Sequence, residues 1–251
     1  MKKFFTLFLV LCASASFAHF QTLIPSTDVV TPAAKTASFH MEFTHPFEQG
    51  PIMEMVKPKD VSVYFDGKKT DLMKSVTKTT IQGKSAWDFK YSFAKPGDYI
   101  FTVTPDYYFE PAEGVFIQHI TKTVVNAFGM EEGWDTPVGL KAEIVPLTRP
   151  YGLWKGNTFT GKVIYKGKAV PNAEIEVEFY NKGSKIKHPT DAHITQVIKA
   201  DANGVFTYAM PFAGWWAFAA LIEDDVTLKH EGKDYPVELG AVFWVKTYGA
   251  D

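Results

Sequence analysis

Short runs in which apolar and polar residues alternate make up most of this chain. Each run is rich in Val, Ile, Thr, Tyr, Phe or Trp and is bounded by Gly, Pro, Asn or Asp, as in DVSVYFDGKKTDL, AWDFKYSFAKPGDYIFTVTP, GVFIQHITKTVVNAF and YPVELGAVFWVKT. A period of two is typical of strands with one buried face, and no long stretch shows the helical period. The pattern therefore predicts an all-β protein of many short antiparallel strands, packed as β-sandwiches.

Turn residues between the runs support this prediction. Asp66-Gly67 and Lys166-Gly167-Lys168 each separate two alternating runs, and such glycine-containing pairs favour tight hairpin turns. The longest apolar run after the N-terminus, GWWAFAALI at 214–222, is too short to span a bilayer and suits a buried strand.

The strand pattern is interrupted once near the middle of the chain, in EIVPLTRPYGLWKGNTFTG. Pro146, Pro150 and Gly152 break the alternation there, and a new alternating run starts at Asn157. We therefore expect two β-sandwich domains, at 19–145 and 152–251, each within the usual size range of a domain.

The first eighteen residues, MKKFFTLFLVLCASASFA, read as a cleaved secretory signal peptide. Lys2 and Lys3 provide the positive charge, a short apolar run follows, and small residues precede a cleavage site after Ala18, with Ala15 as the alternative. Cleavage removes the only cysteine, so the mature chain would have neither a disulfide nor a thiolate ligand. We expect an exported protein of the bacterial periplasm that does not span the membrane.

Composition and motifs exclude several classes of function. The formal net charge is −2 with scattered charges, which gives no electrostatic footprint for nucleic acid. The chain has no Gly-x-Ser-x-Gly nucleophile motif, HExxH zinc signature, P-loop or dinucleotide fingerprint. The sequence therefore favours a binding protein over an enzyme.

Cleavage after Ala18 would make His19 the first residue. Its α-amine and its ring Nδ1 could then close a chelate ring on one metal ion. Imidazole and amine nitrogens suit Ni(II) and Cu(II), which favour square-planar or tetragonal nitrogen sites. The alternative is that cleavage merely exposes a histidine.

Further ligands are expected in SFHMEFTHPFEQGPIMEM. His40 and His45 have opposite parity on an extended strand, so both could meet one metal only if the strand bends before Pro46. Met53 and Met55 follow within a few residues, although methionines more often fill gaps in a core. His119, which interrupts the apolar run GVFIQHITKTVV, is a tentative fourth ligand; it could equally be a structural histidine.

These features together resemble a known family, the periplasmic accessory component of energy-coupling-factor-type nickel and cobalt uptake systems. The matching stretches are AHFQTLIPS, HMEFTHPFEQGP, YFEPAEGVFIQHITKTVVNAFG and EIVPLTRPYGLWKGNTFTGKVIYKGKAVPNAEIEVEFYN, which cover most of the mature chain. The stretches GKVIYKGKAVPNAEIEVEFYN and ADANGVFTYAMPFAGWWAFAA also resemble the transthyretin-like or carboxypeptidase-regulatory sandwich. The resemblance implies a protein that hands Ni(II), or Co(II), to a membrane transporter and performs no catalysis.

Three other readings stay open. Soft thioethers select Cu(I), so a site with Met41, Met53 or Met55 would indicate a copper-binding protein. A mature N-terminal histidine with a second histidine is also the metal brace of copper-dependent polysaccharide monooxygenases, whose other motifs are not visible here. A structural or adhesive sandwich would bind no metal.

Overall fold

The computed structural model describes residues 19–250, and the expectation of an all-β protein is confirmed. These residues form four β-sheets, and the part of the chain that is described contains no α-helix. One 3-10 helix, η1 (Asp191–His193), is the only helical element among them. No described helix is long and apolar enough to cross a membrane.

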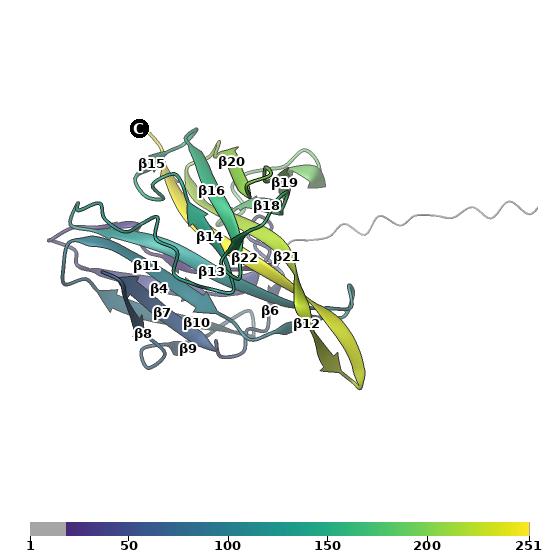
Figure 1. Ribbon diagram of the computed structural model, residues 1–251. Coiled ribbons are helices and arrows are strands. Elements are labelled where there is room, and N and C mark those ends of the chain that lie inside the picture. Colours follow the sequence, from purple (N-terminus) through teal and green to yellow (C-terminus); the bar gives the residue numbers. More distant parts are fainter. Residues whose placement is uncertain (1–18, 251) are drawn as a thin grey trace, which may run out of the picture.

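The largest sheet has eleven strands and extends from the N-terminal half of the molecule to the C-terminal half (Figure 1). Its main path is, in order across the sheet, β19 (Gln196–Lys199), β18 (Glu174–Phe179), β21 (Gly214–His230), β22 (Lys233–Tyr248), β13 (Val115–Ala127), β11 (Gly97–Thr104), β7 (Asp60–Phe65) and β8 (Lys68–Asp71). Three short strands add to it: β3 (Val29–Val30) and β12 (Tyr108–Glu110) pair with β13, and β15 (Leu153–Trp154) pairs with β22.

Three smaller sheets complete the fold. The N-terminal half has a four-stranded sheet of β2 (Ile24–Pro25), β4 (Thr36–Met41), β10 (Lys84–Ser92) and β9 (Thr77–Ile81). The C-terminal half has another, of β14 (Ala142–Pro146), β16 (Thr158–Tyr165), β17 (Lys168–Ala169) and β20 (Val205–Ala209). The third is small and consists of β1 (Phe20–Gln21), β5 (Phe43–Thr44) and β6 (Ile52–Met53).

The two four-stranded sheets pack on opposite faces of the large sheet, and β13 shows why. Side chains alternate across a strand, so successive apolar residues of β13 enter different cores. Ile120 and Val124 belong to the core under the C-terminal sheet, whereas Ile117 and Val125 belong to the core under the N-terminal sheet. The molecule therefore has two hydrophobic cores, offset along one shared sheet.

The two halves are joined by a parallel pair of strands, whereas the sequence predicted antiparallel strands. β13 and β22 pair in parallel over eight positions, from Phe116 opposite Val237 to Thr123 opposite Trp244. Parallel neighbours need a long crossover connection, and here the intervening second half of the chain provides it. The two predicted halves are thus fused through one sheet, and the boundaries 19–145 and 152–251 stay a prediction.

A buried ion pair fastens β13 to the C-terminal sheet. Nζ of Lys122 lies 2.8 Å from Oε2 of Glu143 on β14, and both side chains are almost completely buried. The same carboxylate accepts hydrogen bonds from the backbone N–H groups of Val138 and Gly139. Because a buried charge is tolerated only when paired and hydrogen-bonded, this pair fixes the position of the 138–143 segment against β13.

The two predicted hairpin turns are present. Asp66 and Gly67 connect β7 and β8 with φ of 50° and 67°, and Lys166 and Gly167 connect β16 and β17 with φ of 48° and 76°. Positive φ at both central residues is the geometry that favours glycine in two-residue hairpins.

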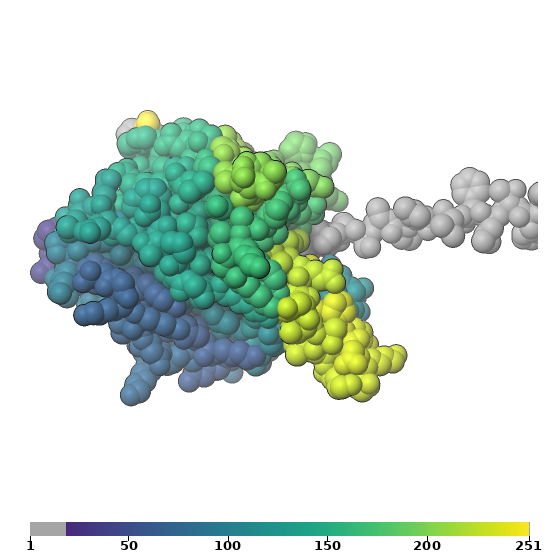
Figure 2. Space-filling view, viewed as in Figure 1, coloured from purple at the N-terminus to yellow at the C-terminus, as the bar shows by residue number. Residues whose placement is uncertain are grey.

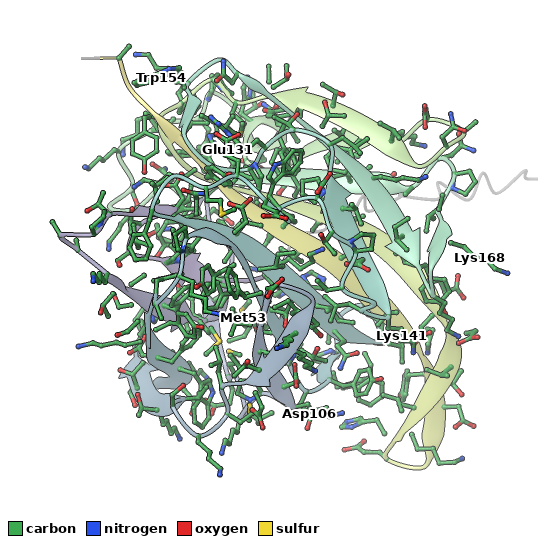
Figure 3. All side chains as sticks on the ribbon, turned by 60° about the vertical axis from the view of Figure 1, so that its left-hand side comes forward. Met53, Asp106, Glu131, Lys141, Trp154 and Lys168 are labelled. Carbon is green, nitrogen blue, oxygen red and sulfur yellow. The ribbon has the colours of Figure 1, made fainter. Side chains whose placement is uncertain are left out.

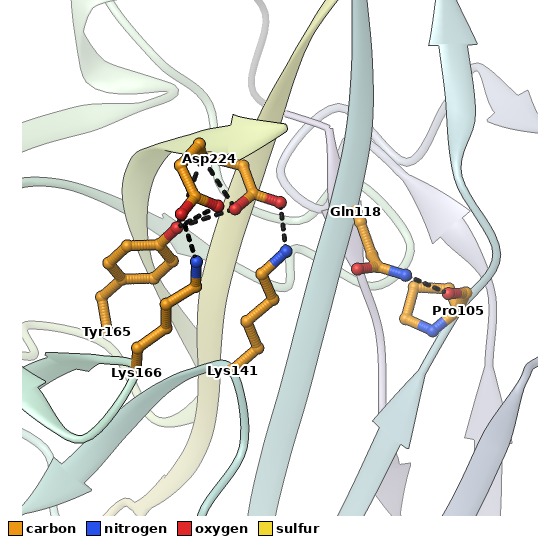
Figure 4. Close-up of polar contacts among 7 residues, drawn as sticks. Pro105, Gln118, Lys141, Tyr165, Lys166 and Asp224 are labelled. Carbon is orange, nitrogen blue, oxygen red and sulfur yellow. Dashed lines mark hydrogen bonds and ion pairs between the residues drawn. The ribbon is translucent and has the colours of Figure 1, made fainter. Parts of the chain in front are cut away.

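The β16–β17 turn is held against β21 by charged side chains (Figure 4). A register shift between Glu223 and Thr227 interrupts the pairing of β21 with β22 and brings Asp224 and Asp225 towards the turn. Tyr165 Oη donates to Asp224 Oδ1 at 2.7 Å, Lys141 pairs with Asp224, and Lys166 pairs with Asp225. Beyond this bulge, the tip of the β21–β22 hairpin projects from the body (Figure 2).

Candidate functional site

The first described residues are fixed firmly in the fold. Phe20 has no exposed surface and packs in a small core with Trp244 of β22. The carbonyl of Gln21 accepts hydrogen bonds from Trp244 Nε1 at 3.0 Å and from Thr121 Oγ1 at 3.3 Å. These contacts determine where the backbone of His19, one residue earlier, can lie.

His19 lies in a cluster of rings next to a carboxylate. Its ring centroid is 4.5 Å from that of His45, with the two planes at 64°, and 5.6 Å from that of Phe43, on which it stacks. Its Nε2 lies 3.5 Å from Oε2 of Glu110, the last residue of β12. Because β1 pairs with β5, Phe20 lies opposite Thr44, and His19 and His45 therefore meet just beyond this pairing. The structure brings these two predicted ligands together.

A tight turn presents His45. β5 ends at Thr44, and the carbonyl of His45 accepts hydrogen bonds from the backbone N–H groups of Gln49 and Gly50. Two contacts hold the turn against the C-terminal half: Glu178 Oε2 accepts from the Phe47 N–H at 3.1 Å, and the Asn181 N–H donates to the Pro46 carbonyl at 3.2 Å. The position of His45 thus depends on β18.

His119 lies behind Phe43, whose ring centroid is 5.9 Å from that of His119. Its side chain is 2% exposed, and neither ring nitrogen has a hydrogen-bond partner among the described residues. The nearest acidic atom is Glu238 Oε1, at 3.8 Å from Nε2. Gly240, opposite His119 in the parallel pairing, makes room for the ring, since a Cβ there would lie 2.3 Å from His119 Cδ2.

Burial keeps the two paired imidazoles neutral. Burial, together with the neighbouring His19, lowers the pKa of His45 to about 4. Burial also lowers the pKa of His19, although Glu110 opposes this shift. Neutral imidazole is the form that ligates a metal, so at neutral pH these rings need not lose a proton before binding one.

His40 does not join this cluster. The chain leaves the four-stranded sheet after Met41 and enters the small sheet at Phe43, so His40 and His45 belong to different sheets. His40 Nδ1 lies 2.6 Å from Asp88 Oδ1, and Nε2 lies 3.4 Å from Glu42 Oε2. Burial acts to lower the pKa of His40, but the hydrogen bonds with these two carboxylates outweigh it and raise that pKa.

The candidate methionines lie in the N-terminal core. Met41, Met53 and Met55 are buried there, and Figure 3 shows Met53 enclosed within the N-terminal half. Met55 also lines a cavity of about 280 Å³ whose wall includes His119.

The site contains residues that the sequence did not single out. Glu110, Glu178 and Glu238 gave no signal, because nothing in their spacing shows that distant strands bring them to the histidines. Gly240 did give a signal in the sequence. A glycine inside the apolar run ELGAVFWV marks a strand position where another group approaches closely.

Side chains alone do not complete a metal site. Within residues 19–250, no three His, Cys, Asp or Glu side chains converge closely enough to hold a metal ion. The arrangement offers a pair of neutral imidazoles and, if the chain begins at His19, a terminal amine beside them. Such a set can bind a cation through nitrogen.

A family model described as "Domain of unknown function (DUF4198)" matches residues 16–224, which include His19, His45, His119 and the strands that present them. The chain belongs to the DUF4198 family. No curated protein matches its sequence.

The solved structures that resemble this DUF4198 protein share little sequence identity with it and have low TM-scores. The D0-D1 domain of intimin is 14% identical, with 86% of this chain and 95% of that chain covered and a TM-score of 0.22. The titin Ig tandem domains A164-A165 are 12% identical, with 92% and 97% covered and a TM-score of 0.23. The adhesin InvE of Yersinia pseudotuberculosis is 13% identical, with 91% and 61% covered and a TM-score of 0.24. Similarity at this level carries no information about a ligand or partner.

The contact between Gly240 and His119 predicts coupling between these positions. Gly240→Ala should destabilise the DUF4198 protein by about 1–3 kcal/mol, because the new methyl group overlaps the His119 ring. In a His119→Ala background the same substitution should cost little, since the overlapping ring is gone. Urea unfolding of the four proteins of this double-mutant cycle measures the coupling. An equal cost of Gly240→Ala in both backgrounds would contradict the contact.

The buried carboxyl group of Glu178 predicts a pH dependence of stability. Burial, with the neighbouring Glu176 and Glu48, raises the pKa of Glu178 to about 8, although hydrogen bonds from Thr195 and Phe47 oppose this shift. Because the folded pKa is raised, the stabilisation from protonated Glu178 is complete below the ordinary carboxyl pKa and is lost as the pH rises through about 8.

Glu178→Gln keeps an acceptor for the Phe47 N–H but cannot ionise. Between about pH 5 and pH 8, wild type should therefore lose stability relative to this variant, by up to about 1.4 kcal/mol per pH unit. Urea unfolding of both proteins across this range measures the difference. Parallel stability curves would show that Glu178 titrates normally in the folded protein.

Proposed function

We propose that this protein, once residues 1–18 are removed, is a periplasmic binding protein for Ni(II), with Co(II) as a second cargo, and that it hands the metal to a membrane uptake transporter. The observation that carries the metal-binding part is the pairing of His19 with His45, whose ring centroids lie 4.5 Å apart. Residues 1–18 lie outside the described residues, so their removal is an expectation from the sequence. It would give His19 a free amine beside this pair.

The donor set fits a borderline transition metal. The amine and Nδ1 of His19 can chelate one ion, and the His45 ring can supply a third nitrogen. Nitrogen ligands of this type suit Ni(II), Co(II) and Cu(II), whereas Mg²⁺ and Ca²⁺ prefer oxygen. The contacts of Phe20 and Gln21 support the proposal, because a terminus that is already held in place loses little freedom when it binds an ion.

His119 lies near the proposed site without completing it. An imidazole that is 2% exposed and has no hydrogen-bond partner among residues 19–250 is costly to the fold. Its Nε2 lies 3.8 Å from Glu238 Oε1, and its ring and that of His19 both contact Phe43, so His119 can support the site through its surroundings. His40 has no part in this site, since its two ring nitrogens face Asp88 and Glu42.

Delivery to a transporter rests on the sequence resemblance. A carrier must release its cargo, and a site of nitrogen ligands without thiolate suits exchange better than a closed cysteine site. The donor set alone would bind Cu(II) more tightly than Ni(II), so the choice of metal in the cell would depend on geometry and supply.

Copper binding is the second candidate function, favoured by Met55. Its side chain lines the same cavity as His119, and a thioether near an imidazole suits Cu(I). Titrations of the protein with Cu(I) and with Ni(II) distinguish the two candidates, because the Met55 sulfur would bind Cu(I) and not Ni(II).

The proposal predicts the effect on Ni(II) affinity of moving the terminal amine or removing one imidazole. Calorimetric titration with Ni(II) of a protein that begins at His19 should show binding of one ion. A variant with one alanine added before His19 keeps both imidazoles but moves the amine away, and its affinity should fall at least about tenfold, as should that of His45→Ala.

His40→Ala is the matched control, since it removes an imidazole from the same stretch of sequence without touching the pair, and it should bind as wild type does. Unchanged affinity in the alanine-extended protein would show that the amine is not a ligand. Loss of binding in His40→Ala alone would place the site elsewhere, and no binding by wild type would reject the proposal for the free ion.

A further inference from the structure

A second feature of the molecule, separate from the histidine pair, is a groove of about 950 Å³. It is lined by residues from all four strands of the N-terminal sheet, β2, β4, β10 and β9, and by residues at the end of β18, in the segment after it and at the start of β21. The groove therefore lies between the N-terminal sheet and the C-terminal half of the molecule. Its volume is within the range of sites for small molecules.

Partly exposed rings form one wall of the groove. Tyr180 and Trp215 line it from the C-terminal half, and Ile24 of β2 lines it from the other side. All three are partly buried against the small core that contains Trp244, so their positions are fixed by packing. Tyr180 Oη also donates to Glu42 Oε1 at 3.3 Å. Fixed rings of this kind offer flat surfaces to a ring of a ligand.

The charges that line the groove are mostly positive. Lys90, Lys182 and Lys185 line it, and none of the three forms an ion pair with any described residue. A buried asparagine shapes the turn that carries two of them. Asn181 Oδ1 accepts from the Ile186 N–H at 2.8 Å, and its Nδ2 donates to the Ile186 carbonyl at 2.9 Å.

The only carboxylate among the lining residues, Asp88, is paired with a histidine. Asp88 lies 2.6 Å from Nδ1 of His40, which also lines the groove. Glu42, which accepts from Tyr180, contacts the other nitrogen of the same histidine, so the three lysines outnumber the carboxylates at the groove. An anion that entered the groove would be attracted by these lysines, which have no ion-pair partner among the described residues.

From this combination we propose that the groove binds a small organic anion that carries a ring. The ring packs against Tyr180 and Trp215, and the acidic group lies among Lys90, Lys182 and Lys185. Aromatic carboxylates and sugar acids share this chemistry. The proposal does not depend on metal binding, because no lining residue of the groove belongs to the His19–His45 pair.

Four probes test the proposal by calorimetry on the protein that begins at His19. 2-Naphthoate and glucuronate each combine a ring with a negative charge, 2-naphthol has the ring without the charge, and acetate has the charge without the ring. We expect one of the first two to bind, and both of the last two to bind at least about tenfold more weakly. Whichever ring acid binds identifies the type of ring.

Two variants locate the binding. Lys182→Gln with Lys185→Gln should weaken it at least about fivefold, because two attractions are lost. Trp215→Leu should weaken it as well. The matched control is Lys229→Gln with Lys233→Gln, which removes two exposed lysines from the distant β21–β22 hairpin and should leave affinity unchanged.

The proposal is overturned if neither ring acid binds, if 2-naphthol or acetate binds as tightly as the ring acid that does bind, or if the 182/185 variant binds as tightly as the 229/233 control. Thermal unfolding of each variant shows whether it is folded. If Trp215→Leu fails to fold, the lysine variants still decide the outcome, since their side chains are exposed.

Discussion

The parallel pairing of β13 with β22 is the constraint on which the rest of this structure depends. This pairing joins strands from both halves of the chain in one eleven-stranded sheet. The two hydrophobic cores lie on opposite faces of that sheet. The pairing also brings His119 opposite Gly240, the residue without a side chain that leaves space for the imidazole. A ring buried at the junction of the two halves can keep its position only while both halves are folded and paired.

The candidate site is assembled on this junction. Trp244, on the same strand as Gly240, anchors the Gln21 carbonyl and packs on Phe20, so the N-terminal segment is fastened to the C-terminal half. Glu178 fastens the turn after His45 to the same half. His19 and His45 thus come from the N-terminal part of the chain, but the C-terminal part positions them. This explains how a residue at a predicted chain end can occupy a defined place.

The sequence predicted the features that depend on neighbouring residues. Alternation identified the all-β class, and glycine pairs identified the turns at Asp66-Gly67 and Lys166-Gly167. The rings of His45 and His19 lie together, and their role as ligands stays a prediction. His40 lies apart, because the chain changes sheets between Met41 and Phe43, and parity along one strand does not show such a change. The surroundings of His119 depend on the pairing of β13 with the distant strand β22, and the contact of Glu110 with His19 depends on where the N-terminal segment packs; local patterns encode neither.

The most direct test of the account is a crystal structure of the protein that begins at His19, grown with Ni(II) and measured at the nickel absorption edge. The account predicts an anomalous peak at coordination distance from the terminal amine, the His19 ring and the His45 ring. A peak beside His40 and Asp88, or no peak near His19 in crystals whose absorption spectrum shows bound nickel, would contradict it.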